Sequence, residues 1–334
     1  MSIQTNFSKI HIAIIILSSL LILPNLTISQ TRQSGQWWPN TEWGADDQAG
    51  ASNRITPQKV MEALNLATTG KIYELGQVYE QDMPIPFNRT YSMILLEKGA
   101  TPGGDNRIVG NSEFLAAEIG QVGTQFDGLG HIGQEVVMDN GDTEYVFYNG
   151  FTAKEMDTGG GLLKLGMEHV KPIITRGILI DIAGYKDTDR LPNSYEVTLQ
   201  DVLGALKNQG MSEADITPGD ALLFRFGWSS LWTQPEAFNT NPPGIGLEVA
   251  RWVAEKKVTM IGSDSYVTEV IPNPDPGLAY PVHQELMMKN GIFNLENMRF
   301  DELIEDNVTE FLFIVTTIRF KGATGSPVRP IAIR

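Results

Sequence analysis

The sequence predicts a single α/β domain in which flanking helices cover a mixed sheet. Strand-like and helix-like segments alternate along the chain, as they do where helices bury a sheet. No shift in composition, Ser- or Pro-rich linker or internal repeat divides residues 30–334. The chain has 334 residues, of which 42% are hydrophobic and 19% charged, so it is long and apolar enough to bury a large core.

The N-terminal residues have the pattern of a signal peptide. Lys9 precedes an apolar run over residues 12–23, which Pro24 ends. This run is short for a membrane-spanning helix but suits the apolar core of a signal peptide. We therefore predict a signal peptide over residues 1–29 and a secreted, periplasmic or otherwise extracytoplasmic protein. The softer apolar stretch over residues 10–28 leaves an N-terminal membrane anchor as the alternative.

The body of the chain begins with an irregular arm and then alternates helices with strands. Residues 30–69 combine this tryptophan-containing arm with a helix that Thr56 caps and Gly70 closes. Thr152 and Glu155 form a capping box and predict a further short helix. The other expected helices cover residues 198–208, 246–256 and 281–289, and the expected strands cover residues 72–76, 176–182, 221–228, 258–262, 292–295 and 310–319.

Composition excludes several functional classes. The chain carries 40 acidic and 25 basic residues, a net charge of −15, which argues against nucleic-acid binding. It has no cysteine, which excludes disulfides, zinc-thiolate sites and cysteine nucleophiles, so any metal must use nitrogen or oxygen ligands. A serine nucleophile in a G-x-S-x-G motif is also absent from the sequence.

A polar, glycine-rich stretch over residues 121–131 is the first candidate for chemistry. Gln125, Asp127 and His131 share parity, so an extended or bulged segment can direct several of these side chains to one side. Asp127 and His131 are both able to bind a metal, and the chain has only four histidines. A structural turn with a surface histidine is the alternative that this stretch leaves open.

A second candidate region lies further along the chain. His283 falls in the first turn of an expected helix, and Glu296 follows the expected strand over residues 292–295. A turn at Gly291 between helix and strand can return Glu296 towards His283. The two regions together supply an oxygen-rich set with two imidazoles that suits Mn²⁺, Mg²⁺ or Zn²⁺, namely Gln121, Gln125, Asp127, His131, His283 and Glu296.

Other polar and aromatic candidates have simpler interpretations. His169 precedes Val-Lys-Pro and is expected on the surface or in a loop. Asp264 follows a strand, where sites of α/β proteins collect, but a structural role in a turn fits it equally. Trp228, Trp232 and Trp252 are expected in the core.

These motifs resemble those of the cyclase-like family of metal-dependent hydrolases, which includes kynurenine formamidase and isatin hydrolase. The family signature is His-x-Gly-Thr-His-x-Asp-x-Pro-x-His. This chain matches it at Gly123, Thr124, Asp127 and His131, and has Gln121, Gln125 and Leu129 in place of the first two histidines and the proline. The family's later metal-binding His and its Glu before Asn-Leu are similar to His283 and Glu296. The resemblance covers roughly residues 70–334, including residues 176–181, 218–228, 262–264 and 322–327.

The resemblance implies the swivelling β/β/α fold of that family and a divalent metal ion. It places Asp127, His283 and Glu296 as metal ligands, Gln121 and Gln125 in two substituted ligand positions, and His131 as the general acid–base or a ligand to a second metal. In such a site the metal polarises a carbonyl and acidifies a bound water, while an imidazole moves the proton. Glutamine offers only a neutral carbonyl oxygen, which favours Mn²⁺ or Mg²⁺ over Zn²⁺.

The function implied by the resemblance is that of an exported, arylformamidase-like amidohydrolase. It would hydrolyse a C–N bond of a small aryl formamide, cyclic imide or lactam-like substrate. We expect a small-molecule substrate and a homo-oligomer, dimer or tetramer, with no nucleic-acid partner and no stable membrane span after signal removal. If Gln121 and Gln125 abolish metal binding, the alternative is a catalytically inactive family member that binds a small molecule.

Overall fold

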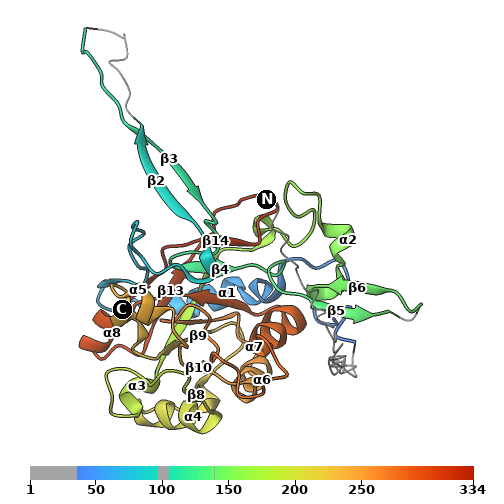
Figure 1. Cartoon of the computed structure of the whole chain (residues 1–334). Coiled ribbons are helices and arrows are strands. Elements are labelled where there is room, and N and C mark those ends of the chain that lie inside the picture. The colour runs from blue at the N-terminus through green and yellow to red at the C-terminus, as the bar shows by residue number, and fades with distance from the viewer. Residues whose placement is uncertain (1–35, 97–104, 139) are drawn as a thin grey trace, which may run out of the picture. The chain divides into compact units, whose positions relative to one another are not determined.

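A nine-stranded mixed sheet forms the centre of the computed structural model, which describes residues 36–96, 105–138 and 140–334 (Figure 1). In spatial order its strands are β1 (Ile72–Glu74), β15 (Ile331–Ile333), β13 (Glu310–Val315), β7 (Ile173–Asp181), β9 (Ala221–Arg225), β11 (Met260–Ser263), β12 (Phe293–Glu296), β4 (Gln125–Asp127) and β14 (Gly325–Pro327). Neighbours from β7 to β12 are parallel, and the outer pairs are antiparallel. The predicted α/β class with a mixed sheet is confirmed.

Apolar side chains cover both faces of the central strands. Along β7, Ile178 and Ile180 belong to one buried cluster, and Leu179 between them belongs to another, as the two-residue repeat of a strand requires. The first cluster includes side chains from α4 (Leu199–Asn208) and α6 (Leu247–Glu255), which lie against this side of the sheet. Burial on both faces explains why the central strands are continuous apolar runs rather than alternating ones.

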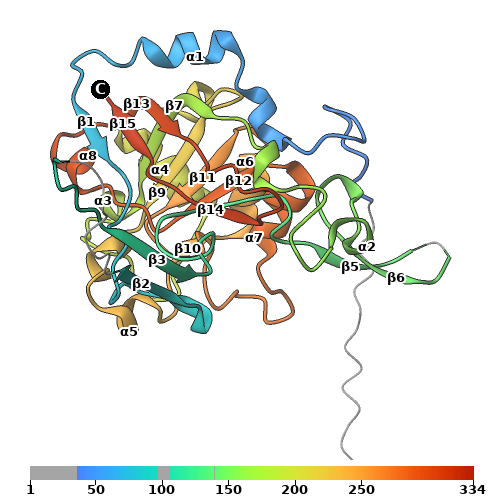
Figure 2. The ribbon, with the colours of Figure 1, turned by 90° about the horizontal axis from the view of Figure 1, so that it is seen from above.

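Shorter elements complete the fold (Figure 2). The remaining α-helices are α1 (Pro57–Leu64), α2 (Ala153–Met156), α3 (Ile182–Tyr185), α5 (Pro235–Phe238), α7 (Pro281–His283) and α8 (Asp301–Glu305). Three two-stranded sheets pair β2 (Tyr91–Leu96) with β3 (Ser112–Ala117), β5 (Gln134–Val137) with β6 (Thr143–Val146), and β8 (Glu196–Val197) with β10 (Gly244–Ile245). In the described residues, no helix is long and apolar enough to cross a membrane. The predicted signal peptide over residues 1–29 lies outside those residues.

Several predicted boundaries were wrong because tertiary hydrogen bonds end the elements early. Helix α1 begins after its Thr56 cap as expected but ends at Leu64, and the following Gly70 amide instead donates to the Arg334 carbonyl at the C-terminus. Strand β9 ends at Arg225 because the next amide, that of Phe226, donates to the Asp264 carboxylate at 2.8 Å.

Other boundaries differ by less. The expected helix over residues 281–289 consists of α7 followed by a π-helical turn, Gln284–Lys289. Strand β12 includes Glu296 rather than ending before it. Strand β13 ends at Val315, whereas the sequence predicted residue 319. The capping box of Thr152 and Glu155 is present at the start of α2, as predicted.

The tryptophans lie where the sequence predicted them. Trp228, Trp232 and Trp252 are buried in the helix-side core. In the N-terminal arm, Trp43 packs against the same core and has the Arg54 guanidinium 4.7 Å from its ring centroid. The aromatic residues of the arm therefore attach it to the body of the protein.

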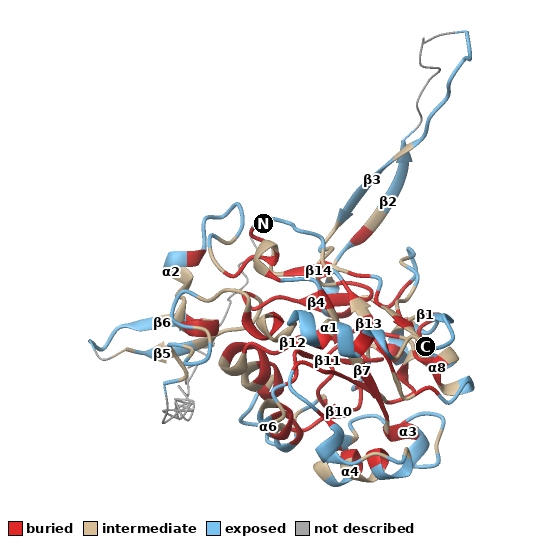
Figure 3. Ribbon diagram, turned by 180° about the vertical axis from the view of Figure 1, so that it is seen from behind, coloured by how far each residue is buried: buried red, intermediate tan, exposed pale blue. Residues whose placement is uncertain are grey.

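The antiparallel pair of β2 and β3 was not predicted and extends away from the nine-stranded sheet as a hairpin (Figure 1). We call it the hairpin arm. Most of its residues are exposed (Figure 3). The exposed residues include large apolar ones on both faces, such as the directly opposed pairs Ile94 with Phe114 and Met93 with Leu115. An isolated two-stranded hairpin is marginally stable in water, and an exposed apolar patch of this kind is unusual for a monomer.

Candidate metal centre

The pairing of β4 with β12 brings the two predicted site regions together. In this antiparallel pair Asp127 lies opposite Asn294, and Gln125 lies opposite Glu296. Phe126, between Gln125 and Asp127, points to the other face of β4, where it packs in the core. The alternation of the two strands therefore directs four polar side chains to one side of the sheet.

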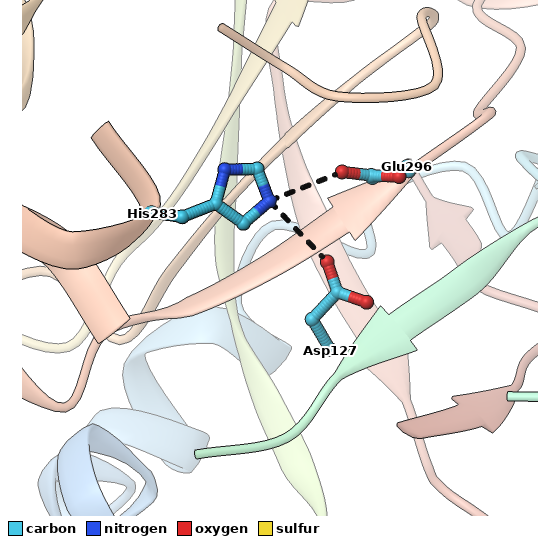
Figure 4. A group of neighbouring side chains, drawn as sticks. All are labelled: Asp127, His283 and Glu296. Atoms are coloured by element: carbon cyan, nitrogen blue, oxygen red, sulfur yellow. Dashed lines mark ion pairs between the residues drawn. The ribbon is translucent and has the colours of Figure 1, made fainter. Parts of the chain in front are cut away.

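Asp127, His283 and Glu296 form a buried group that could hold a metal ion (Figure 4). Their potential ligand atoms all lie within 4.8 Å of one another. His283 Nε2 is 3.4 Å from Glu296 Oε1 and 3.8 Å from Asp127 Oδ2. Two carboxylates and an imidazole at this spacing have the donor chemistry of Mn²⁺, Zn²⁺ or Mg²⁺ sites.

Glu269 orients the imidazole of His283. Its carboxylate accepts hydrogen bonds from the backbone amides of Val282 and His283, both at 3.1 Å, at the start of α7. The same carboxylate contacts His283 Nδ1. With Nδ1 held in this way, Nε2 is the ring atom that faces Asp127, Glu296 and the Asn294 amide, and it is the atom that could bind a metal. This is the arrangement by which carboxylates hold metal-binding histidines in other proteins.

Amide groups surround the two carboxylates. Asn294 Nδ2 donates to Asp127 Oδ2 at 3.0 Å and to Glu296 Oε1 at 2.9 Å. Gln125 Nε2 donates to Glu296 Oε2 at 3.0 Å, and Gln121 Nε2 is 3.4 Å from Asp127 Oδ1. Within the described ranges, no Lys or Arg forms an ion pair with any carboxylate of this cluster.

Two buried oxygen atoms support the fit of a cation. Gln121 Oε1 and Asn294 Oδ1 are buried and have no hydrogen-bond partner among the described residues, a costly condition for a carbonyl oxygen. Both belong to side chains whose nitrogen atoms contact Asp127. Hard divalent cations bind carboxylate and amide oxygens. The residues present therefore fit such an ion.

The buried carboxylates and histidines perturb one another's pKa values. Burial, together with the charge of Asp127, raises the pKa of Glu296 to about 8. Burial alone would raise the pKa of Asp127, but the His283 hydrogen bond and the charge of His131 outweigh it and lower this pKa. Burial opposes the charged form of His283, yet its hydrogen bonds to Asp127, Glu269 and Glu296 hold its pKa well above the usual value.

A pocket of about 220 Å³ opens onto this cluster. Gln121, Gln125, His131, His283 and Glu296 all line it, and Asp127 lies directly beside them, so the six predicted site residues come together. The rest of the lining consists of Phe87, Arg89, Ile132, Tyr266, Val267 and Tyr280. A larger depression of about 440 Å³, between Arg190 and Thr240, contains none of the predicted ligands.

Residues 73–270 match the model of the family described as "Putative cyclase". The chain belongs to this cyclase family. One solved structure, described as a novel cyclase, shares 29% sequence identity, covers 87% of this chain and 96% of its own, and has a TM-score of 0.76.

Two more distant structures share the fold of this cyclase-family protein. Isatin hydrolase A from Ralstonia solanacearum is 17% identical over 83% of this chain and 97% of its own, with a TM-score of 0.58. Isatin hydrolase A from Labrenzia aggregata, bound to benzyl benzoate, is 18% identical over 82% and 97%, with a TM-score of 0.56. No curated protein matched the sequence.

His131 differs from His283 in its environment. It follows β4 in a turn whose backbone hydrogen bond joins the His131 amide to the Gly128 carbonyl at 3.0 Å. Burial lowers the pKa of His131, and the opposing effect of the Asp127 charge does not cancel this. The imidazole is therefore neutral near pH 7 and able to accept a proton.

The remaining candidates lie apart from the centre. His169 ends a short 3₁₀ turn, Met167–His169, and is half-buried beside Glu168. Asp264 is buried and accepts hydrogen bonds from the backbone amides of Phe226 and Ser229, which is the structural alternative predicted for it.

Three residues of the site were missed by the sequence analysis. Asn294 could have been predicted, because it lies two residues before Glu296 on the same strand and therefore faces the same side of the sheet. Glu269 and Arg89 had none, because both lie in irregular segments that reach the site only through the tertiary fold.

Proposed function

We propose that this cyclase-family protein is an exported, metal-dependent amidohydrolase. Its substrate is proposed to be a small aryl formamide, cyclic imide or lactam-like compound, whose C–N bond it hydrolyses. The buried group of Asp127, His283 and Glu296 at the base of a pocket that also contains a neutral histidine carries the proposal. Isatin hydrolases share the fold, which supports testing isatin among the substrates.

Asp127, His283 and Glu296 would hold the ion. Asn294 contacts all three through Nδ2, so its Oδ1 could become a further donor only if the amide turned over. A bound divalent ion supplies a Lewis acid that polarises a carbonyl and makes water more acidic at neutral pH. Because the donor set has one imidazole and otherwise oxygen atoms, Mn²⁺ is favoured and Mg²⁺ or Zn²⁺ is the alternative.

His131 would perform the proton transfers. Its neutral imidazole accepts a proton from the attacking water, and the resulting imidazolium donates that proton to the departing nitrogen. The C–N bond breaks and a C–O bond forms, so a formamide or lactam gives a carboxylate and an amine, and a cyclic imide gives a carboxylate and an amide. Phe87, Tyr266 and Tyr280 would hold the aromatic ring and limit access of water to the reacting carbonyl.

The test combines elemental analysis with a hydrolysis assay. Purified protein should contain a divalent metal and should hydrolyse N-formylaniline, isatin or phthalimide after loading with Mn²⁺, Zn²⁺ or Mg²⁺. Asp127→Ala and His283→Ala should each reduce the metal content, whereas His131→Gln should retain the metal and lose turnover. Absence of turnover with every metal and every compound would overturn the proposal.

The side-chain amide of Gln125 favours one alternative, namely a catalytically inactive family member that binds a small molecule. Nε2 rather than Oε1 of Gln125 faces Glu296, so this side chain satisfies a carboxylate without a metal. A protein that binds aromatic ligands but retains no metal at millimolar concentrations would support the alternative.

We further propose that the protein forms a homo-oligomer through the hairpin arm. Apolar side chains on both faces of this arm are exposed, and a second copy of the chain would cover them. Export through the signal peptide over residues 1–29 stays a prediction, which N-terminal sequencing of the mature protein would test.

A further inference from the structure

Among the described residues that line the pocket, Arg89 is the only lysine or arginine. Its side chain is half-buried, and one Nη1–H group donates to the backbone carbonyl of Gln121 at 2.8 Å. The guanidinium carbon lies 5.0 Å from the ring centroid of Phe87. None of the ion pairs in the described part of the chain involves Arg89. Arg89 therefore forms no direct ion pair there, although its charge acts on Glu296 across the pocket and opposes the rise of the Glu296 pKa.

Phe87, which contacts this guanidinium, belongs to a group of three aromatic rings. The Phe87 ring lies 5.9 Å from Tyr266 and 6.4 Å from Tyr280, with edge-to-face orientation in both pairs. Tyr280 in turn lies 6.1 Å from the imidazole of His283. The rings form a wall that leads from Arg89 to the candidate metal centre. A planar ring is the ligand shape that such a wall accommodates.

The contacts of Arg89 with the protein leave most of its hydrogen-bonding capacity unused. A guanidinium has five N–H donors in a planar fork, and only one bond to the protein is present in the described residues. A structural role of Arg89 explains its hydrogen bond to Gln121 and the packing of its guanidinium on the Phe87 ring. It leaves the other N–H groups of the guanidinium, which have no acceptor among the described residues, available to a ligand in the pocket.

We propose that Arg89 forms an anion subsite that binds a carboxylate group carried by an aromatic substrate. This inference rests on the proposed function and specifies its substrate class, namely an aryl amide with a carboxylate on the ring or on a short side chain. The fork of the guanidinium matches a carboxylate in two parallel hydrogen bonds. The ring of the substrate packs against Phe87, and its amide carbonyl points towards His283 and Glu296.

The subsite is separate from the metal-binding group. The carboxylates at the base of the pocket attract cations, whereas Arg89 attracts an anion at the wall. A substrate that carries a carboxylate is therefore held in one orientation, with its anionic group at Arg89 and its amide at the base. A neutral aryl amide lacks this constraint.

The test compares benzoate with benzamide, which has the same shape without the charge. Dissociation constants are measured by calorimetry on the full-length mature protein, in metal-loaded and in metal-stripped form. We expect benzoate to bind about tenfold or more tightly than benzamide in both forms, as for a charge-assisted pair. Arg89→Met should abolish this preference and leave benzamide binding within about twofold.

Two further variants control the measurement. Arg251→Met removes an exposed positive charge from α6 and should leave the preference intact. Arg89→Lys keeps the charge without the fork and should give an intermediate preference, which also provides a result if Arg89→Met does not fold.

A preference that persists in Arg89→Met, or one that appears only in the metal-loaded form, would overturn the inference, because the carboxylate would then bind elsewhere. The measurement needs no turnover. Anion binding without hydrolysis would refute the proposed function alone, and hydrolysis without anion preference would refute the subsite alone.

Discussion

Replacement of Glu269 by glutamine tests whether the orientation of His283 controls metal binding. Glu269 accepts hydrogen bonds from the amides of Val282 and His283 and contacts His283 Nδ1. Glutamine has nearly the same shape but supplies one acceptor and one donor in place of two acceptors. It cannot satisfy all three partners, because one of its two positions must present an N–H group.

Each orientation of the glutamine amide has a defined cost. If Nε2 faces His283 Nδ1, the ring proton moves to Nε2, which then cannot bind a metal. If Nε2 faces the Val282 amide instead, two donors oppose each other in a buried place at about 1–3 kcal/mol. Loss of a carboxylate that orients a ligand histidine costs about 10- to 100-fold in metal affinity in comparable sites, or about 1.4–2.7 kcal/mol.

The measurement is a competition titration of Mn²⁺ and Zn²⁺ against a fluorescent chelator at pH 7. We expect Glu269→Gln to weaken both affinities by about 10- to 100-fold. Glu285→Gln is the matched control, since it removes one acidic charge from the neighbouring π-helical turn, where Glu285 pairs with Lys289 at 3.0 Å. An affinity within twofold of the unmodified protein for Glu269→Gln would refute this account of His283.

Three further predictions concern the glutamines, a buried aspartate and the hairpin arm. The double variant Gln121→His, Gln125→His should increase zinc affinity more than manganese affinity in the same titration, because imidazole is the better zinc ligand; an equal change for both ions would argue that neither position faces the metal. Burial raises the pKa of Asp264 from its ordinary value of 3.8 to about 6, against the opposing hydrogen bond from Phe226. The folded state therefore binds a proton that the unfolded state releases, and this stabilisation is present below pH 4 and lost as the pH rises through 6. Relative to the unmodified protein, Asp264→Asn should gain about 2 kcal/mol of unfolding free energy between pH 4 and pH 7, measured by urea denaturation; a difference independent of pH would contradict the shift. In the hairpin arm, the double variant Ile94→Lys, Phe114→Glu places an ion pair at directly opposed positions. It should reduce the particle mass measured by light scattering to that of one chain. The arm would be excluded from the interface if this variant and Met93→Lys, Leu115→Glu on the other face both left the mass unchanged.

The sequence predicted the parts of the site that depend on local periodicity. Gln125 and Asp127 share parity on β4, and the antiparallel register with β12 places Glu296 beside them. The helix that carries His283 begins where the proline predicted it. In each case a repeat of two residues or a helix cap determines the direction of the side chain, and both features are visible in residues that are neighbours in the sequence.

The missed parts depend on contacts that no local pattern encodes. Glu269 reaches His283 from an irregular segment after β11, across fourteen positions of the chain. Arg89 lies 32 positions before Gln121, the residue to which it is bonded. The hairpin arm was missed for another reason. Its strands are apolar on both faces without being buried, which makes them resemble neither a half-buried nor a core strand.

The charges of the centre distinguish a changed metal site from a lost one. Asp127, Glu269 and Glu296 are 0%, 1% and 3% exposed, and in the described residues His283 is the only side chain that forms an ion pair with them. Burial of an unpaired carboxylate costs several kcal/mol, so this group needs either a proton or a metal ion. The pKa of Glu296, about 8, indicates that a proton satisfies it at neutral pH when no metal is bound.

Proton and metal ion then compete for the same carboxylate, so metal binding must release protons and the metal affinity must rise with pH. Relative to the family signature, the exchange at Gln121 and Gln125 replaces one neutral ligand by another and leaves every charged group of the centre in place. A site that had ceased to bind cations would gain stability by losing these buried carboxylates. Their retention favours a change in the preferred metal over its loss.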